Sequence, residues 1–401
     1  MQLRYNYRLD PQPRHQAALG KAFGCARVVF NDALDVREAA HQAGKRYVTD
    51  RELSARLTAA KKTPQRAWLG EVSSVVLQQA LADLNAAYRN YFASIKGTRK
   101  GPKVAKPRFR SRKDRRQAIR FTANARFKVL PNGKLRLPKI GDVPVRWSRL
   151  LSSEPSSVTV IKDAAGRYFA SFVIETQPTP LPQTEHAVGI DLGLTHFAVL
   201  SDGRKIASPQ FLRRAEKKLS RAQRNLSRKQ KDSSNRTKAR VKVARAHARV
   251  ADARRDFHHQ LSTALIRDNQ AVAVEDLAVR ALGRTRLAKS VHDAGWSSFV
   301  GMLEYKARLY GREFHRIGRF VPTSQTCSAC GVKDAPKPLH VRAWRCPSCG
   351  VWLDRDINAA VNVARAAGLA VTACGAQVRP EPVPAQRSEA GTHPTSYRDA
   401  A

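Results

Sequence analysis

The sequence feature that most constrains the fold is a pair of Cys-x-x-Cys motifs that are separated by fifteen residues. The first motif holds Cys327 and Cys330, and the second holds Cys346 and Cys349. Each motif turns two thiolates toward one centre, and two such turns supply the four-sulfur tetrahedron of a structural zinc site. Disulfide bonds are the alternative, but they are disfavoured because the N-terminus lacks the apolar core of a secretion signal. The spacing therefore predicts a zinc ribbon.

Acidic residues stand out at three places in the same half of the chain. Asp191 interrupts one apolar run, Glu275 ends a second, and Asp354 and Asp356 lie between the second cysteine pair and a helical pattern. Carboxylates brought together from strand ends can hold two Mg²⁺ ions about 4 Å apart for phosphodiester hydrolysis. Any one of these acids alone is more simply a helix cap or a surface charge. Their order around the cysteine motifs favours a metal-dependent nuclease site.

The charge balance points to a polyanionic partner. The 401 residues include 73 Lys and Arg against 32 Asp and Glu, a net charge of +41. This excess indicates nucleic acid as the partner. A membrane is disfavoured, because no apolar run approaches the ~20 residues that span a bilayer. Six cysteines, four of them in the zinc pattern, fit a reducing cytoplasm and leave Cys25 and Cys374 as unpaired thiols.

Two segments concentrate the positive charge. Residues 96–120 hold twelve basic residues and one acidic residue, with glycines and prolines that prevent a continuous helix. A solvated linker is the alternative to a phosphate-binding loop, and we predict the loop. Its expected nucleic-acid-binding residues are Arg108, Arg110, Arg112 and Arg116. Residues 212–255 hold seventeen basic and three acidic residues without a proline, which predicts a long helical hairpin with a basic outer face.

The remaining patterns predict an α+β multidomain chain. Strand-like alternation over residues 3–9 gives way to a helical pattern from residue 15 to about residue 95. Short alternating runs over residues 121–174 predict an antiparallel meander or a small barrel, into which the first strand pairs. The helical block is then an insertion in the barrel. Further elements are expected as strands at 188–200, 271–277 and 314–317, an amphipathic helix at 296–310, and a closing helix at 357–367.

Several motifs together resemble one known family. They are GIDLG followed by THFAVLSDG, then VEDL, QTCSACG with CPSCG, and DRDINAAVNV, all within residues 186–368. They resemble the TnpB family encoded by bacterial insertion sequences, whose members are RNA-guided DNA nucleases related to type V CRISPR effectors. The basic segment at 107–121 resembles the loop that precedes the barrel in that family.

The resemblance implies a RuvC nuclease domain of RNase H-like fold. Its metal-binding triad would be Asp191, Glu275 and Asp356, with Mg²⁺ as the catalytic ion and zinc as the structural ion. Residue spacing alone leaves Asp354 and Asp356 open as the third ligand. The family favours Asp356, because its aspartate lies two residues before the Asn-Ala-Ala sequence.

The implied activity is Mg²⁺-dependent cleavage of double-stranded DNA that leaves 5′-phosphate and 3′-hydroxyl ends. A guide RNA would read the target by base pairing while the protein reads a short flanking motif. We expect a cytoplasmic monomer that associates with the nucleoid when bound to DNA. Two alternatives remain: a transposase that joins strands with the same triad, and a guide-directed repressor that binds DNA without cutting. The intact acids argue against the repressor.

The resemblance also divides the chain into segments. They are expected as the first strand of a wedge barrel at 1–14, a helical recognition domain with the basic loop at 15–117, the rest of the barrel at 118–180, the RuvC domain at 181–321, the zinc ribbon at 322–350, the end of the RuvC domain at 351–372 and a disordered tail at 373–401.

Overall fold

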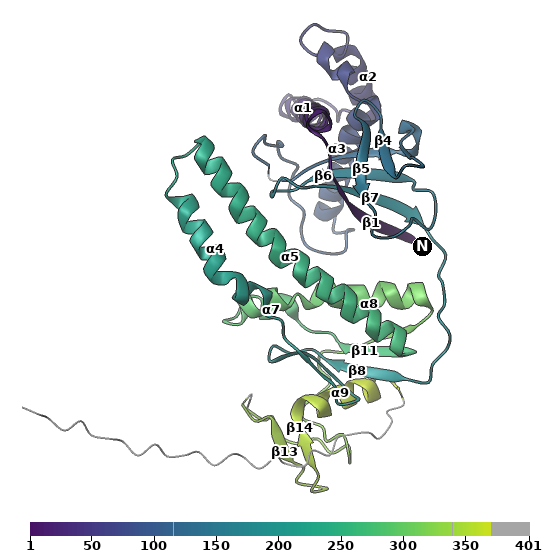
Figure 1. The fold of residues 1–401 in the computed structure, drawn as a ribbon, viewed down its shortest axis with the longest axis vertical. Helices are drawn as coiled ribbons and strands as arrows, with labels where there is room; N and C mark the ends of the chain where they lie inside the picture. Colours follow the sequence, from purple (N-terminus) through teal and green to yellow (C-terminus); the bar gives the residue numbers. More distant parts are fainter. Residues whose placement is uncertain (115, 339, 370–401) are drawn as a thin grey trace, which may run out of the picture. The chain divides into compact units, whose positions relative to one another are not determined.

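A computed structural model of the chain describes residues 1–114, 116–338 and 340–369 (Figure 1). Cys374 and the tail predicted at 373–401 lie outside the described residues. Two units are distinguished by their internal contacts. The first comprises residues 1–179 and 211–255, and the second comprises residues 180–210 and the chain from residue 256 onward. Residues 211–255, which the sequence analysis assigned to the nuclease domain, therefore group with the first unit.

The first unit contains a curled antiparallel sheet. In the described residues its seven strands run in the order β2-β6-β7-β1-β5-β4-β3. They are β1 (Gln2–Leu9), β2 (Gln117–Thr122), β3 (Lys128–Val129), β4 (Lys134–Leu137), β5 (Gly141–Arg146), β6 (Ser157–Lys162) and β7 (Tyr168–Glu175). As predicted, β1 pairs into a sheet whose other strands come after residue 116. The sequence analysis expected a small barrel. The two-residue strand β3 and the strand β2 form opposite edges, so the described strands make a half-barrel.

Helices separate β1 from β2, as the sequence analysis expected. They are α1 (Pro13–Gln42), α2 (Asp50–Ala60), a short 3₁₀ helix (Ala67–Glu71) and α3 (Ser74–Ile95); a second 3₁₀ turn (Ala123–Ala125) follows β2. One face of α3 is buried at Leu77, Leu81 and Leu84, and it shares one core with the sheet. Between α3 and residue 114 the chain has neither helix nor strand, in agreement with the predicted loop.

The predicted basic hairpin consists of α4 (Phe211–Ser227) and α5 (Ser234–Asp268). The connecting turn contains Asp232 in a left-handed backbone conformation, with φ of 63°. Arg236 at the start of α5 donates hydrogen bonds to the carbonyls of Leu226 (3.3 Å) and Lys229 (2.7 Å). The guanidinium therefore adds hydrogen bonds to carbonyl groups at and just beyond the C-terminal end of α4, and it ties the two helices of the hairpin together.

The second unit contains a mixed sheet with the order β10-β9-β8-β11-β12 in the described residues. The strands are β8 (Ala187–Asp191), β9 (His196–Leu200), β10 (Lys205–Ala207), β11 (Ala271–Glu275) and β12 (Glu313–Ile317). Strand β11 runs parallel to both neighbours, β8 and β12, whereas β8, β9 and β10 are antiparallel. A separate ladder pairs β13 (Ala343–Arg345) with β14 (Trp352–Asp354).

Helices complete the second unit. They are α6 (Val279–Leu282), α7 (Ala288–Ala294), α8 (Trp296–Tyr310) and α9 (Arg355–Ala366). Trp296 is buried in the core, and Tyr310 packs against that core while half-buried, which agrees with the amphipathic helix predicted at 296–310. No helix in the described ranges is long and apolar enough to cross a membrane.

A glycine allows α9 to lie directly against β8. A Cβ atom at Gly189 would lie 2.2 Å from the carbonyl oxygen of Ala360 and 2.6 Å from the amide nitrogen of Ala364. Backbone atoms that close leave no room for any side chain, so the strand requires glycine at this position. The close approach brings the end of β8, which carries Asp191, near the first turn of α9, which carries Asp356.

Candidate active site and cysteine cluster

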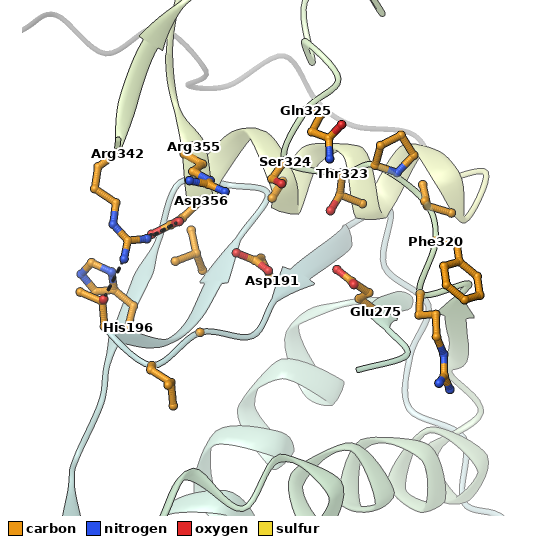
Figure 2. Close-up of a pocket in the computed structure, with 18 of the residues that line it drawn as sticks. Asp191, His196, Glu275, Phe320, Thr323, Ser324, Gln325, Arg342, Arg355 and Asp356 are labelled. Atoms are coloured by element: carbon orange, nitrogen blue, oxygen red, sulfur yellow. Dashed lines mark hydrogen bonds and ion pairs between the residues drawn. The ribbon is translucent and has the colours of Figure 1, made fainter. Parts of the chain in front are cut away.

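The three predicted acids line one cleft of the second unit (Figure 2). Asp191 is the last residue of β8, Glu275 is the last residue of β11, and Asp356 is the second residue of α9. Because β8 and β11 are parallel neighbours, with Ile190 opposite Val274, their carboxyl ends place Asp191 and Glu275 at the same edge of the sheet. The cleft has a volume of about 710 Å³.

The acids in this cleft repel one another. The pKa of Asp191 is raised to about 7, mainly by burial and also by the nearby charges of Asp356 and Glu275, against the lowering effect of two arginines. Burial also raises the pKa of Glu275, while a hydrogen bond from the Thr323 side chain lowers it. Both shifts mean that the charged carboxylates are less stable here than in water. A cation bound between these carboxylates would therefore stabilise their charged forms.

The structure separates the roles of the two candidate aspartates at the start of α9. One oxygen of Asp354 accepts hydrogen bonds from the backbone N–H groups of Asp356 and Ile357, both at 3.0 Å, and so caps the helix. Its other oxygen lies 2.5 Å from the ammonium of Lys205. Asp354 is thus occupied outside the cleft, whereas Asp356 lines it. The geometry favours Asp356 as the third ligand.

An arginine that the sequence analysis did not single out contacts Asp356. The guanidinium of Arg342 donates to the carboxylate of Asp356 at 3.1 Å and to the hydroxyl of Thr195 at 3.2 Å. Arg342 immediately precedes β13, and its carbonyl accepts a hydrogen bond from the backbone N–H of Arg355 at 2.8 Å. Among 73 Lys and Arg residues, neither arginine carried a sequence signal that set it apart.

Two buried asparagines connect α9 to the chain that enters the cysteine motifs. Asn358 donates to the carbonyl of Thr326 at 2.8 Å, and Asn362 donates to the carbonyl of Thr323 at 2.8 Å. The side-chain oxygen of Asn358 accepts from the backbone N–H of Ser328 at 2.7 Å. The signal that could have found them is a pair of amides four residues apart on an otherwise apolar helix. They hold the cysteine motifs against the helix that carries Asp356.

The four cysteines converge as predicted. Their sulfurs all lie within 4.8 Å of one another, in the one such group of three or more potential ligands within the described ranges. The Cys327–Cys349 and Cys330–Cys346 sulfur pairs are each 3.7 Å apart. A tetrahedral site with Zn–S bonds of ~2.3 Å has edges of ~3.8 Å. These separations are far longer than a disulfide bond and match the edges of that tetrahedron.

The arginines predicted to bind nucleic acid lie in the first unit and differ from one another. Arg108, Arg112 and Arg116 are exposed. The guanidinium of Arg110 instead lies 3.8 Å from the ring centre of Phe30 and donates to Asp83 at 3.2 Å. These two contacts make Arg110 a packing residue of the loop, and the other three arginines are the more accessible candidates for phosphate contact.

Three family models match the chain. A model described as "Probable transposase" matches residues 171–286, and one described as "Cas12f1-like, TNB domain" matches residues 296–363. A third, described as "Helix-turn-helix domain", matches residues 1–46. In the structure that stretch holds β1 and the uninterrupted helix α1.

Curated relatives match nearly the whole chain. A protein of Streptomyces pristinaespiralis named "Putative RNA-guided DNA endonuclease" is 46% identical over 381 residues, which cover 94% of this chain and 92% of the relative. The chain belongs to the TnpB family. A second relative of this TnpB-family chain, "Putative RNA-guided DNA endonuclease InsQ" of Escherichia coli K12, is 31% identical and covers 94% of each protein.

A solved structure shares the fold of this TnpB-family chain. The protein in the "Cryo-EM structure of the Cas12f1-sgRNA-target DNA complex" superposes with a TM-score of 0.53 at 13% identity, covering 87% of this chain and 82% of the other. The mixed α/β architecture is therefore common to both proteins.

Proposed function

We propose that this chain is an RNA-guided DNA endonuclease of a mobile element, which cuts double-stranded DNA beside a short flanking motif. The observation that carries the proposal is the convergence of Asp191, Glu275 and Asp356 on one cleft. The chain that holds this cleft is 46% identical to a relative named for RNA-guided DNA cleavage. We assign the second unit a RuvC-type architecture of RNase H-like fold, because two acids end parallel strands and the third begins a packed helix.

The residues of the cleft fit a hard divalent cation. Carboxylate oxygens are the ligands that Mg²⁺ prefers. The raised pKa of Asp191 reflects burial first and repulsion by Asp356 and Glu275 second, and such an ion would offset both. Two Mg²⁺ ions bound there would activate a water molecule and stabilise the leaving oxygen of a phosphodiester. The four cysteines fit zinc instead, since their sulfurs have the spacing of a tetrahedral site.

The protein's own residues would hold this site in place. Asp354 fixes the first turn of α9, so that the side chain of Asp356 faces the cleft. Thr323 orients Glu275 through a hydrogen bond. Arg342 and Arg355 line the same cleft and are suited to bind phosphate oxygens of the DNA backbone.

Recognition would rest on other parts of the chain. Base pairing between guide RNA and target reads the DNA sequence, and the protein mainly contacts the phosphate backbone of the nucleic acids. The exposed arginines Arg108, Arg112 and Arg116 and the basic hairpin α4–α5 supply positive charge for those contacts. We expect the loaded protein to act as a monomer.

The test uses the full chain with the guide RNA of its own element, a matched DNA duplex and Mg²⁺. We expect both strands to be cut, leaving 5′-phosphate ends, only when the guide matches and Mg²⁺ is present. Joined DNA products would indicate a strand-transfer enzyme. Guide-dependent binding without cutting, over a range of divalent metals and flanking motifs, would indicate a repressor.

A further inference from the structure

An aromatic side chain at the cleft is almost completely exposed. Phe320 is 92% exposed, the highest value among the large hydrophobic residues of the described part of the chain. It lies on the Glu275 side of the cleft, away from Arg342 and Asp356 (Figure 2). Single exposed hydrophobic residues are common on proteins, so exposure alone assigns no role. This ring, however, lies beside three converging carboxylates.

The backbone on both sides of Phe320 is fixed. The N–H of Val321 donates to the carbonyl of Gly318 at 3.2 Å and closes a backbone turn that contains Phe320. Arg319 forms an ion pair with Asp276, next to Glu275. On the other side, the carbonyl of Thr323 accepts the buried amide of Asn362 at 2.8 Å. The segment is thus anchored to the strand end and to α9, while the ring between these anchors contacts solvent.

We propose that Phe320 is a stacking platform for an unpaired base of the DNA strand that enters the cleft. Every base has a flat π face, so an exposed aromatic ring can bind a strand without reading its sequence. Basic residues line the same cleft, including Arg319, Lys333 and Arg342, and they complement the phosphates of that strand. A duplex offers no free base face, so the occupant is a single strand. Its place beside the nuclease carboxylates favours DNA over the guide RNA. This inference rests on the proposed function, because the strand is the nuclease substrate.

The stacked base would fix the register of the strand. With one base against Phe320 and basic side chains on the phosphates, a phosphodiester a short distance along the strand is presented to the carboxylates. Phe320 is then a substrate-positioning residue, and it takes no part in bond cleavage itself. Removing the ring should weaken strand binding, whereas another flat aromatic ring should preserve it.

The binding experiment uses the full chain bound to its guide RNA, in magnesium-free buffer at raised salt, with short single-stranded DNA. Phe320→Ala should weaken binding about 5- to 100-fold, and Phe320→Trp should bind as the wild type does. Phe320→Leu should resemble Phe320→Ala, because it is apolar but not flat. The matched control is Leu150→Ala, which removes a side chain that is 89% exposed in the first unit and should change nothing.

An abasic scan distinguishes stacking from a structural role. One position of the strand is made abasic at a time, and the penalty of Phe320→Ala should vanish when the missing base is the stacked one. Wild-type binding by Phe320→Leu, or a penalty that is the same on every abasic strand, overturns the inference. A loss of guide-RNA affinity without a loss of DNA affinity also overturns it, since the ring then contacts the guide.

Cleavage of the matched duplex with Mg²⁺ is measured on the same variants. Phe320→Ala should lower kcat/KM mainly through KM, with zinc content unchanged. If the wild type binds the strand in a Phe320-dependent way and never cuts, the proposed function fails and the stacking inference stands. If the wild type cuts and all Phe320 variants match it in both assays, the reverse holds.

Discussion

The cysteine cluster and the carboxylate cleft differ in how the chain builds them. The cluster takes its four ligands from residues 327–349, and each Cys-x-x-Cys motif is closed by its own turn. In the first turn the backbone N–H of Gly331 donates to the carbonyl of Cys327, and in the second that of Gly350 donates to the carbonyl of Cys346, both at 2.9 Å. The cleft takes its acids from residues 191, 275 and 356. These residues meet only because β8 pairs in parallel with β11 and α9 packs against β8. Local turns define the first site, and long-range packing defines the second.

The largest expected effect comes from breaking that packing. Gly189→Ala places a Cβ 2.2 Å from the carbonyl of Ala360, so α9 must move away from β8. Overpacking of this kind costs about 1–3 kcal/mol or more, and we expect a lower Tm together with loss of cleavage. Zinc content should stay near one equivalent, since the cysteine turns are local.

The control for this variant lies in the same unit. Gly301→Ala in α8 meets no atom within 4 Å, and alanine favours a helix by up to about 1 kcal/mol. Its Tm should be unchanged or slightly higher. Loss of zinc in Gly189→Ala, at a temperature where the chain is still folded, would show that the cysteine cluster depends on the packing of α9 against β8.

The reverse change removes a ligand of the cysteine cluster. Cys346→Ser should abolish tight zinc binding, because metal binding and local folding are linked. Cleavage should fall strongly, since β14 leads directly into Asp354 and Asp356. Cys25→Ser, at a buried cysteine outside the cluster, should keep its zinc. Metal analysis of both variants checks this, and full zinc retention by Cys346→Ser would contradict the four-ligand assignment.

A smaller effect concerns the stability of the cleft without Mg²⁺. The pKa of Asp191 is raised from 3.8 to about 7, so the folded state retains a proton that the unfolded chain loses between these pH values. Stability of the wild type should therefore fall as pH rises from about 4 to about 7, and level off above. Asp191→Asn lacks this fall and should have a Tm about 5 °C higher at pH 8, with a smaller difference at pH 5.

Thermal melts in magnesium-free buffer measure this difference. A chelator is left out, so that the cysteine cluster keeps its metal. Equal melting temperatures of the wild type and Asp191→Asn at pH 8 would show that the Asp191 carboxylate is not destabilised by burial and neighbouring charges in the folded protein.

The contrast between the two sites also explains what the sequence could predict. The cysteine spacing was sufficient for the cluster, because each ligand pair lies within one turn. The strand-end position of Glu275 followed from an apolar run of β-branched residues, whereas Asp191, which was expected to interrupt a strand, is the last residue of β8. Their meeting at one sheet edge did not follow from these runs, because strand order depends on contacts between residues far apart in the sequence. The half-barrel has the same origin, since the edges of a sheet are set by which strands find partners.

Only side-chain direction distinguishes Asp354 from Asp356, and it is the basis for proposing Asp356 as the third ligand. A single aspartate directly before a helix is a common N-cap, and that signal applied to Asp354. The position of Asp356 in the first turn of a helix does not predict that its side chain faces the cleft. That direction is set by the packing of α9 on β8. The contacts of Arg342 and Arg110 could not be predicted for a different reason. In a chain with a net charge of +41, nothing in the sequence distinguishes one arginine from the next.

Cleavage by Asp356→Asn compared with Asp354→Asn tests the central claim most directly. Asparagine caps a helix about as well as aspartate, so Asp354→Asn keeps the first turn of α9 and should cut within about tenfold of the wild type. Asp356→Asn removes a proposed Mg²⁺ ligand and should cut at least about 10³-fold more slowly, with guide and target binding unchanged. Wild-type cleavage by Asp356→Asn would contradict the account.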